Sequence, residues 1–412
     1  MTLSGRTVPL IVPHFYVKPV LSKKTLTERI LSKKTLSKKI PSKNYRAWIE
    51  INLVALKHNA RVLQELLPKQ CKLMAVVKAN AYGHGDIAIA KALNQWGICA
   101  FAVATLEEGI HLRKNSIKGE ILILGYTNPC DIDCLVHYRL TQTVVDCAYA
   151  KILNDSGKKI KIHIKIDTGM HRLGVNADNH SEIESIFKYD NLMVEGVFSH
   201  LCVSDSLKGE DIIYTGYQIE QFFNTVNFLI SKGYSPGKLH IQSSYGILNY
   251  PDLPCDFARA GIALYGVLSD NNRTLEKPDL WPVLSLKSRI AMVKEIESGE
   301  SVSYGRQYIA DNNMKIAMVT IGYADGIPRN ISRSNANVLL HGKKALIIGR
   351  ICMDQLVIDV TNISMVEPGD IVTIIGRDGN EHIRCEDIAE KCGTISNEIL
   401  SRLGSRLKHV IV

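Results

Sequence analysis

Short apolar runs alternate with amphipathic helical segments from residue 73 to about residue 284, and this pattern restricts the fold more than any other feature of the chain. The candidate strands are 73–79, 100–104, 121–125, 141–146, 160–167, 194–200, 239–243 and 263–266. Helical patterns such as 84–97 and 216–233 separate them and end in glycine, as helices often do. Eight such repeats over about 240 residues predict a (β/α)8 barrel of the TIM type. We place this domain at residues 45–284, beginning with the strand-like segment RAWIEINL.

After about residue 282 the pattern changes to strands and turns. Strand-rich segments occur at 285–296, 315–326, 337–350, 354–361 and 370–376, and a helical segment at 396–407 is expected to close the chain. Alternation of apolar and polar residues is typical of antiparallel sheets. We therefore expect a separate, mainly antiparallel β domain at residues 285–412.

The formal net charge of +9 comes from the N-terminus alone. Residues 1–44 contain ten basic residues against the single acidic Glu28, so the remaining chain is neutral overall. This segment repeats LSKKTL at 21–26 and 31–36, and it predicts a basic, flexible tail. A membrane-surface or nucleic-acid arm is the alternative. A basic groove for nucleic acid is not expected in the globular body.

Ten cysteines are scattered without a CxxC pair, which is typical of reduced thiols in the cytoplasm. No run of about 18 apolar residues occurs, so no membrane span is expected. The apolar stretch 8–17 is short, is broken by Pro9 and Pro13, and lacks the cleavage site of a secretory signal.

The sharpest local signal is AVVKANAYGHG at 75–85, in which Lys78 ends an apolar strand. Catalytic groups of barrels lie at the carboxyl ends of strands, and a buried lysine is the residue type that forms Schiff bases. A surface lysine at a strand end is the competing interpretation.

Six motifs occur in an order that resembles bacterial alanine racemases over residues 45–412. They are VKANAYGHG, KIDTGMHRLG (165–174), ARAGIALYG (258–266), VSYGR (302–306), GYADGIPR (322–329) and GRICMDQ (349–355). The resemblance implies a pyridoxal 5'-phosphate enzyme with no metal.

Lys78 matches the lysine that carries the cofactor and acts as one base, and Tyr304 matches the opposing base. In the family this tyrosine comes from the neighbouring subunit, which implies a homodimer with shared active sites. Judged alone, Tyr304 would be an aromatic residue filling a turn.

Further cofactor contacts follow from the same resemblance. Arg259 matches the arginine on the pyridine nitrogen, which donates a hydrogen bond without giving up its proton and so favours racemisation over transamination. His200 matches a histidine that packs against the ring, although a lone strand-end histidine is otherwise structural. The phosphate is expected to contact Tyr82, Ser244 and the backbone amides of Gly261 and Ile262. Ser243 stands where the family often has asparagine.

Substrate contacts are implied as well. Arg172 matches an arginine that steers the substrate carboxylate, and Tyr323, Met353 and Asp354 lie in motifs that reach across the dimer interface. Lys165 matches a lysine that is carbamylated in several relatives, and an ordinary strand lysine is the alternative.

Asn397 departs from the family, which usually has tyrosine there. Asparagine is smaller and adds an amide that can bond a hydroxymethyl group, so the exchange favours serine as a substrate beside alanine. The same exchange is a feature of the VanT-type serine/alanine racemases of vancomycin-resistance clusters. These carry an N-terminal membrane domain, so the chain is expected to be a soluble relative or a separated catalytic domain. The alternative is that Ser396 and Asn397 only cap a helix.

Other functions remain open at this point. A housekeeping alanine racemase differs only in substrate preference. A non-catalytic pyridoxal-phosphate-binding barrel would lack the β domain and the Tyr304, GYADG and CMDQ motifs. Decarboxylation or aldol cleavage on the same fold would need substrate pockets that the sequence does not show.

Overall fold

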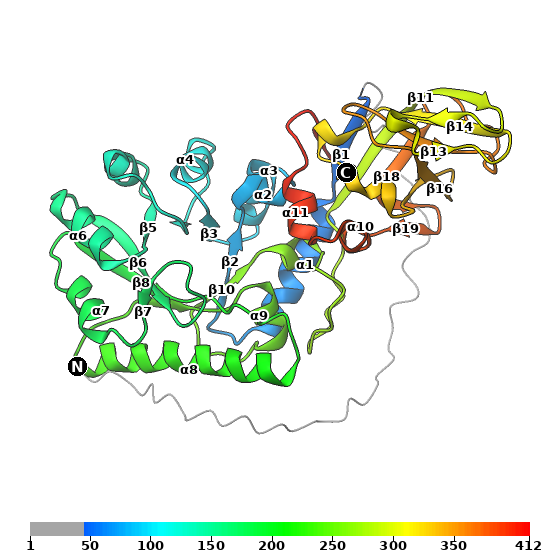
Figure 1. The fold of residues 1–412 in the computed structure, drawn as a ribbon. Helices are drawn as coiled ribbons and strands as arrows, with labels where there is room; N and C mark the ends of the chain where they lie inside the picture. The colour runs from blue at the N-terminus through cyan, green and yellow to red at the C-terminus, as the bar shows by residue number, and fades with distance from the viewer. Residues whose placement is uncertain (1–44) are drawn as a thin grey trace, which may run out of the picture. The chain divides into compact units, whose positions relative to one another are not determined.

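A computed structural model describes residues 45–412; the predicted basic tail at 1–44 lies outside the described residues. Eight parallel strands form one sheet in the order β10-β2-β3-β4-β5-β6-β8-β9 (Figure 1). Their bounds are β2 (Lys72–Val76), β3 (Ala100–Val103), β4 (Glu120–Ile123), β5 (Thr141–Val144), β6 (Ile160–Asp167), β8 (Leu192–Phe198), β9 (Lys238–His240) and β10 (Phe257–Ala260).

Two backbone hydrogen bonds connect the segments of the two edge strands, β9 and β10, and bring the sheet close to a closed barrel. Asp256 donates to the Leu239 carbonyl at 2.8 Å, and Arg259 donates to the Gln242 carbonyl at 3.1 Å. The predicted strand at 263–266 is wrong, because Ile262–Tyr265 form a 3-10 helix, η3, and the eighth strand is β10. Both segments are largely buried, but Arg259 interrupts the apolar pattern of β10, whereas η3 has an uninterrupted one.

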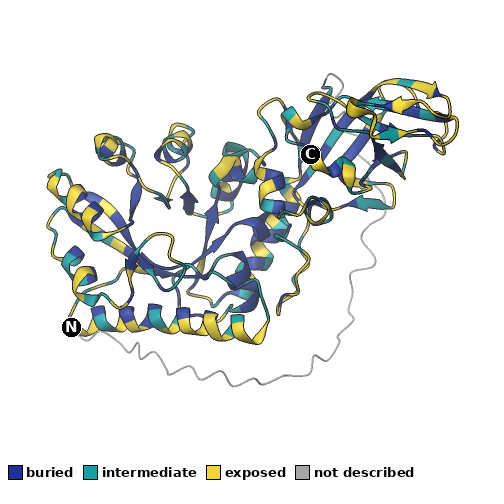
Figure 2. Ribbon diagram, viewed as in Figure 1, coloured by how far each residue is buried: buried dark blue, intermediate teal, exposed yellow. Residues whose placement is uncertain are grey.

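Helices cover the outside of the barrel, and their outer faces are exposed while the strands are buried (Figure 2). Asn52, Thr105, Asp146 and Asn179 cap four of these helices by accepting a backbone N–H, as short polar side chains commonly do. The helices are α1 (Leu53–Leu66), α2 (Lys78–Tyr82), α3 (Asp86–Gln95), α4 (Leu106–Lys114), α5 (Ile132–His137), α6 (Cys147–Asp155), α7 (His180–Phe187), α8 (Gly209–Ser231) and α9 (Ser244–Asn249). The short strand β7 (Val175–Asn176) pairs with β6.

The C-terminal third is a mainly antiparallel β domain, as predicted. Pairing between β18 and β11 closes the path β18-β15-β16-β17-β14-β11 into a ring, which leaves no free edge within it. Its strands are β11 (Leu284–Ile296), β14 (Met314–Val319), β15 (Asn337–Leu340), β16 (Lys343–Ile348), β17 (Leu356–Asp359) and β18 (Ile371–Asp378), with β19 (Glu381–Ile383) beside β18. A small hairpin of β12 (Ser301–Val302) and β13 (Tyr308–Ile309) and the helices α10 (Cys385–Cys392) and α11 (Ser396–Ser401) complete it. The predicted fold class is confirmed.

The ends of the described chain meet in this β domain. Strand β1 (Ala47–Ile51) pairs with β11, so the segment placed at the start of the barrel belongs instead to the other sheet, where its blue ribbon lies beside β11 in Figure 1. The helix at the C-terminus is shorter than predicted and is followed by β20 (Lys408–Ile411), which pairs in parallel with β1.

All ten cysteines lie within the described residues and are free thiols. Among residues 45–412, no helix has the length and apolar character needed to cross a membrane.

Candidate active site

A cavity of about 570 Å³ opens at the carboxyl ends of the barrel strands. Most of the residues predicted for cofactor and substrate line it: Lys78, Tyr82, Lys165, Arg172, His200, Ser244, Arg259, Gly261, Ile262 and Asn397. The barrel brings these residues together because successive parallel strands end at the same edge.

Lys78 sits on an unusual turn directly after β2. The next four residues, 79–82, all have positive φ between 52° and 54°, so α2 is a single turn of left-handed helix. This conformation costs an L-residue roughly 1–2 kcal/mol each. Burial, followed by repulsion from Arg172, lowers the pKa of Lys78. A lysine with a lowered pKa is more often neutral, so a larger fraction of it can act as a nucleophile or accept a proton.

Glu108, which was not among the predicted site residues, holds this turn. One carboxylate oxygen accepts the Ala79 N–H and the other accepts the Ala104 N–H, both at 2.7 Å. Glu108 thereby joins the segments that follow β2 and β3. Its signal in the sequence is the Thr105-x-x-Glu108 pattern of a helix start, since the Thr105 hydroxyl accepts the Glu108 N–H.

Hydroxyl groups and backbone amides form a cradle beside Gly261. Ser244 Oγ accepts the N–H groups of Gly261 at 3.1 Å and Ala263 at 3.2 Å, which leaves its own O–H free to donate to a ligand. A Cβ atom on Gly261 would lie 2.9 Å from Tyr82 Oη, so only glycine leaves this space open. Ser243, the residue that departs from the family, lines the same side of the cavity and makes no helix-capping bond.

Arg259 is buried at the floor of the cavity and is held from several sides. Nη1 donates to His240 Nδ1 at 2.7 Å, while Nη2 donates to the Ser199 carbonyl at 2.7 Å and to His200 Nδ1 at 3.1 Å. Burial lowers the pKa of Arg259 to about 10, which still leaves the guanidinium charged at neutral pH. Burial and the nearby cations lower the pKa of His200 well below its usual range, so the imidazole is neutral.

Lys165 is the most deeply buried lysine of the cavity, with 6% of its surface exposed. Its Nζ donates to the Ile166 carbonyl at 2.9 Å and lies 5.6 Å from the centre of the Phe198 ring. Burial and then repulsion from Arg259 lower the pKa of Lys165 to about 7. Much of this amine is therefore neutral at neutral pH.

Asn397 faces the cavity from the β domain, on the first turn of α11. Neither Ser396 nor Asn397 caps this helix, because the N-cap position is Ile395 and no side-chain bond closes it. Among residues 45–412, the buried Asn397 Oδ1 has no hydrogen-bond partner. The helix-cap interpretation of this pair is therefore wrong, and Asn397 lines the cavity with an amide oxygen that has no partner.

The remaining predicted residues gather on the β domain and do not line the cavity of their own chain. Tyr304, Met353 and Tyr323 are 66%, 53% and 39% exposed. The GYADG and CMDQ loops are joined by backbone bonds from Tyr323 to Cys352 and from Ala324 to Met353.

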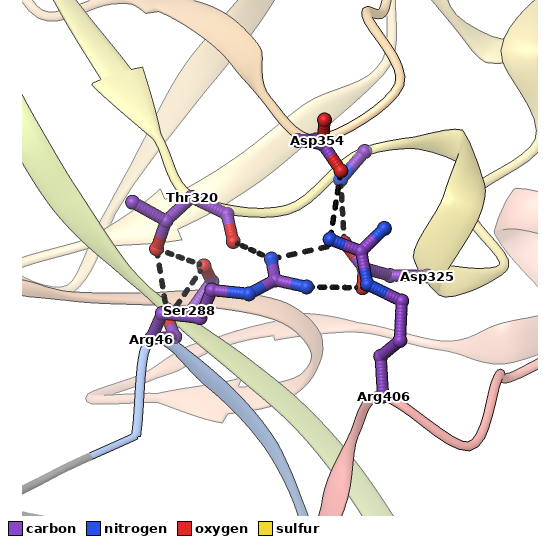
Figure 3. Close-up of polar contacts among 7 residues, drawn as sticks. Arg46, Ser288, Thr320, Asp325, Asp354 and Arg406 are labelled. Atoms are coloured by element: carbon purple, nitrogen blue, oxygen red, sulfur yellow. Dashed lines mark hydrogen bonds and ion pairs between the residues drawn. The ribbon is translucent and has the colours of Figure 1, made fainter.

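Hydrogen bonds and ion pairs of charged side chains hold these loops in place (Figure 3). The buried Asp325 accepts from Arg46 and from the Gly322 N–H, and Arg406 pairs with Asp354 at 2.7 Å. Asp354 thus contacts a neighbouring arginine rather than the cavity.

Comparison with known proteins assigns the chain. The profile described as "Alanine racemase, N-terminal domain" matches residues 51–269, and "Alanine racemase, C-terminal domain" matches residues 283–411. The chain belongs to the alanine racemase family. An "Amino-acid racemase" of Enterococcus faecalis is 45% identical over 363 residues, which are 88% of this chain and 51% of that protein. A "Serine/alanine racemase" of Enterococcus gallinarum is 41% identical over the same shares. The chain spans about half the length of these curated relatives.

The alanine racemase fold extends over nearly all described residues. The solved "alanine racemase [Clostridium difficile 630]" is 34% identical, with a TM-score of 0.83, and the match covers 89% of this chain and 96% of that one. Enzymes of the alanine racemase family use pyridoxal 5'-phosphate. The residues found here fit that group, because a lysine, a cradle of hydroxyls and amides and a buried guanidinium line one cavity.

Proposed function

We propose that this chain is a pyridoxal 5'-phosphate-dependent racemase that interconverts L- and D-serine and L- and D-alanine by a two-base mechanism. The observation that carries the proposal is the position of Lys78, a lysine of lowered pKa in a cavity with a dianion cradle and a buried arginine. Decarboxylation or aldol cleavage would use the same cavity, but nothing in its lining favours either over proton exchange.

Lys78 would hold the cofactor and then act as one of the two bases. Tyr82, Ser244 and the amides of Gly261 and Ile262 would bind the phosphate, and Arg259 and His200 would lie against the ring. When bound to an amino acid, pyridoxal phosphate withdraws electron density from Cα and makes its proton acidic. Lys78, released from the cofactor, would take or return this proton on one face.

Tyr304 of a second copy would serve the opposite face. Its phenol is exposed on its own chain, beside the loops of Tyr323 and Met353, which suits a surface that completes another subunit's site. We therefore propose a homodimer in which each β domain contributes these loops to the partner's cavity, with Arg172 and the Met353 amide binding the substrate carboxylate.

Asn397 would extend the substrate range to serine. Its unpaired Oδ1 can accept the hydroxyl of serine, while its small size leaves room for the hydroxymethyl group. A single hydrogen bond rarely excludes a smaller substrate, so alanine should also react. We propose a role in supplying D-amino acids for peptidoglycan precursors, with vancomycin resistance as one setting. A housekeeping alanine racemase is the second candidate, favoured by the alanine racemases among solved structures.

Lys165 would be carbamylated in the working enzyme. Addition of CO2 to the neutral amine forms an N–C bond and releases a proton, and the resulting anion would offset the charges of Arg172 and Arg259. The lowered pKa of Lys165 supports this proposal because the neutral amine is the reacting form.

Kinetics on L-serine and L-alanine with the wild type and Asn397→Tyr test the proposal. We expect both substrates to react in the wild type, and the ratio of kcat/KM for serine to that for alanine to fall roughly tenfold in the variant. Lys78→Ala should abolish racemisation and the visible absorbance of the lysine-bound cofactor. An unchanged ratio would reject the role of Asn397, and an unchanged spectrum would reject that of Lys78.

A further inference from the structure

A chain of buried polar side chains runs from the cavity into the barrel interior toward the amino ends of the strands. Arg259 Nη1 lies 2.7 Å from His240 Nδ1, His240 Nε2 lies 2.8 Å from His163 Nδ1, and His163 Nε2 lies 3.0 Å from Glu120 Oε1. Arg259, His240 and His163 are buried, and Glu120 lies at the amino end of β4. The proposed mechanism uses Arg259 but none of the other three groups.

The nitrogen that carries the proton in each histidine can be assigned from the two ends of this series, Arg259 and Glu120. Arginine has only donors, so Arg259 must donate to His240 Nδ1, and a neutral His240 then carries its proton on Nε2. That proton points at His163 Nδ1, which must accept it, so a neutral His163 also carries its proton on Nε2. The last N–H faces Glu120, and an ionised carboxylate only accepts. Every link therefore has one donor and one acceptor, in one direction.

Close packing holds the two imidazole rings in these positions. The Phe198 ring stacks on His240 with centroids 4.6 Å apart at an angle of 7°. A Cβ atom on Gly196 would lie 2.6 Å from His163 Cε1, so His163 occupies space that only glycine leaves free.

Glu120 is the last of these four side chains and the only anion among them. None of the ion pairs among the described residues includes Arg259, although its guanidinium is buried. Among residues 45–412, neither His163 Nε2 nor Glu120 Oε1 makes a hydrogen bond, and the ion-pair contact of 3.0 Å between these two buried atoms is the link between the two side chains. The side chain of Glu120 is 23% exposed and also borders a second cavity at the amino ends of the strands.

We infer that Glu120 is a remote positioning residue for Arg259, acting through His163 and His240. Its carboxylate fixes the Nε2–H tautomer of both histidines, so that His240 presents only an acceptor to Arg259 and the guanidinium stays in place to meet the cofactor. The kinetic consequence rests on the proposed function, whereas the tautomers do not.

Nitrogen NMR of histidine labelled with 15N in the imidazole ring tests the tautomers directly on the full chain. We expect neutral Nε2–H forms for His163 and His240 in the wild type and in Glu120→Gln, which keeps a carbonyl acceptor. Glu120→Lys replaces the acceptor with donors, so the His163 signals should change. A wild-type spectrum with a charged or Nδ1–H form of either histidine would overturn the inference, with no variant needed.

Kinetics of the same proteins give the second readout. In Glu120→Lys, kcat for racemisation should fall roughly tenfold while KM changes less than about twofold, because the ionic contact between Glu120 and His163 is lost and the substrate contacts remain. Glu195→Lys is the matched control, since Glu195 borders the same second cavity but pairs with Lys161. Equal kcat values for Glu120→Lys and Glu195→Lys would contradict the inference.

If Glu120→Lys does not fold, Glu120→Met removes the acceptor without adding charge, and the same loss of kcat is expected. A wild type that does not racemise would reject the proposed function and leave the tautomer test intact.

Discussion

Four basic side chains, Lys78, Lys165, Arg172 and Arg259, line one cavity, and Lys165 lies deepest among the lysines. A buried ammonium near two guanidinium groups is unfavourable, and the protein responds by lowering the pKa of Lys165 to about 7. The same cations suit a phosphate dianion and a substrate carboxylate. The clustered positive charge thus lowers the stability of the folded protein and at the same time favours binding of these anionic groups.

The stability of the chain should depend on pH through Lys165. Below pH 7 the folded and unfolded states both carry its proton, and the folded state bears the full cost of burying it. Between pH 7 and the usual pKa of 10.5 the folded state loses the proton first, so the free energy of unfolding should rise with pH across this window. Denaturation in carbonate-free buffer should show the wild type gaining stability relative to Lys165→Met as pH rises. A difference that stays constant with pH would contradict the lowered pKa.

Lys78 could be predicted from the sequence itself, because it ends an apolar strand and the barrel places strand ends at one edge. His200 and Arg259 were predicted through the resemblance to alanine racemases. His163 and Glu120 could not be predicted, since each acts through a partner far along the chain whose position only the folded barrel sets.

The left-handed turn of α2 is the strained element of the site. It follows the strand that carries Lys78, and Glu108 and a bond from the Asp86 N–H to Asn80 Oδ1 hold it. Four consecutive residues with positive φ persist only where surrounding contacts determine them. We infer that this strain fixes Lys78 in the cavity.

Glycine substitutions of opposite effect test this strain. Ala79→Gly should raise the free energy of unfolding by roughly 1 kcal/mol, because glycine adopts the left-handed conformation without steric cost. Ala88→Gly, in the ordinary helix α3, should lower it by about 1 kcal/mol. Chemical denaturation measures both. Destabilisation of similar size in the two variants would show that the turn is not strained.

Elements with a regular pattern were predictable, and those shaped by long-range pairing were not. Seven barrel strands follow from their apolar runs. The membership of β1 in the β domain does not, because its partners β11 and β20 lie more than 200 residues away. The segment 263–266 is apolar because it is buried, and burial alone does not distinguish a strand from a 3-10 turn.

At the scale of the whole molecule, the predicted site residues form two groups. One group lines the barrel cavity, and the other, with Tyr304, Tyr323 and Met353, is exposed on the β domain. A proton-exchanging site with bases on both faces of Cα requires both groups. Two copies of the chain would supply them if each β domain faced the partner's barrel.

Mixing two inactive variants tests this account most directly. Lys78→Ala and Tyr304→Phe should each lack racemisation of L-alanine and L-serine as pure proteins. Random reassociation makes about half of the dimers mixed, and each mixed dimer has one site with both bases, so activity should return to about a quarter of the wild-type value. Size-exclusion chromatography of the wild type checks the dimer. Recovery to that level would support a shared site, and no recovery from variants that reassociate would contradict it.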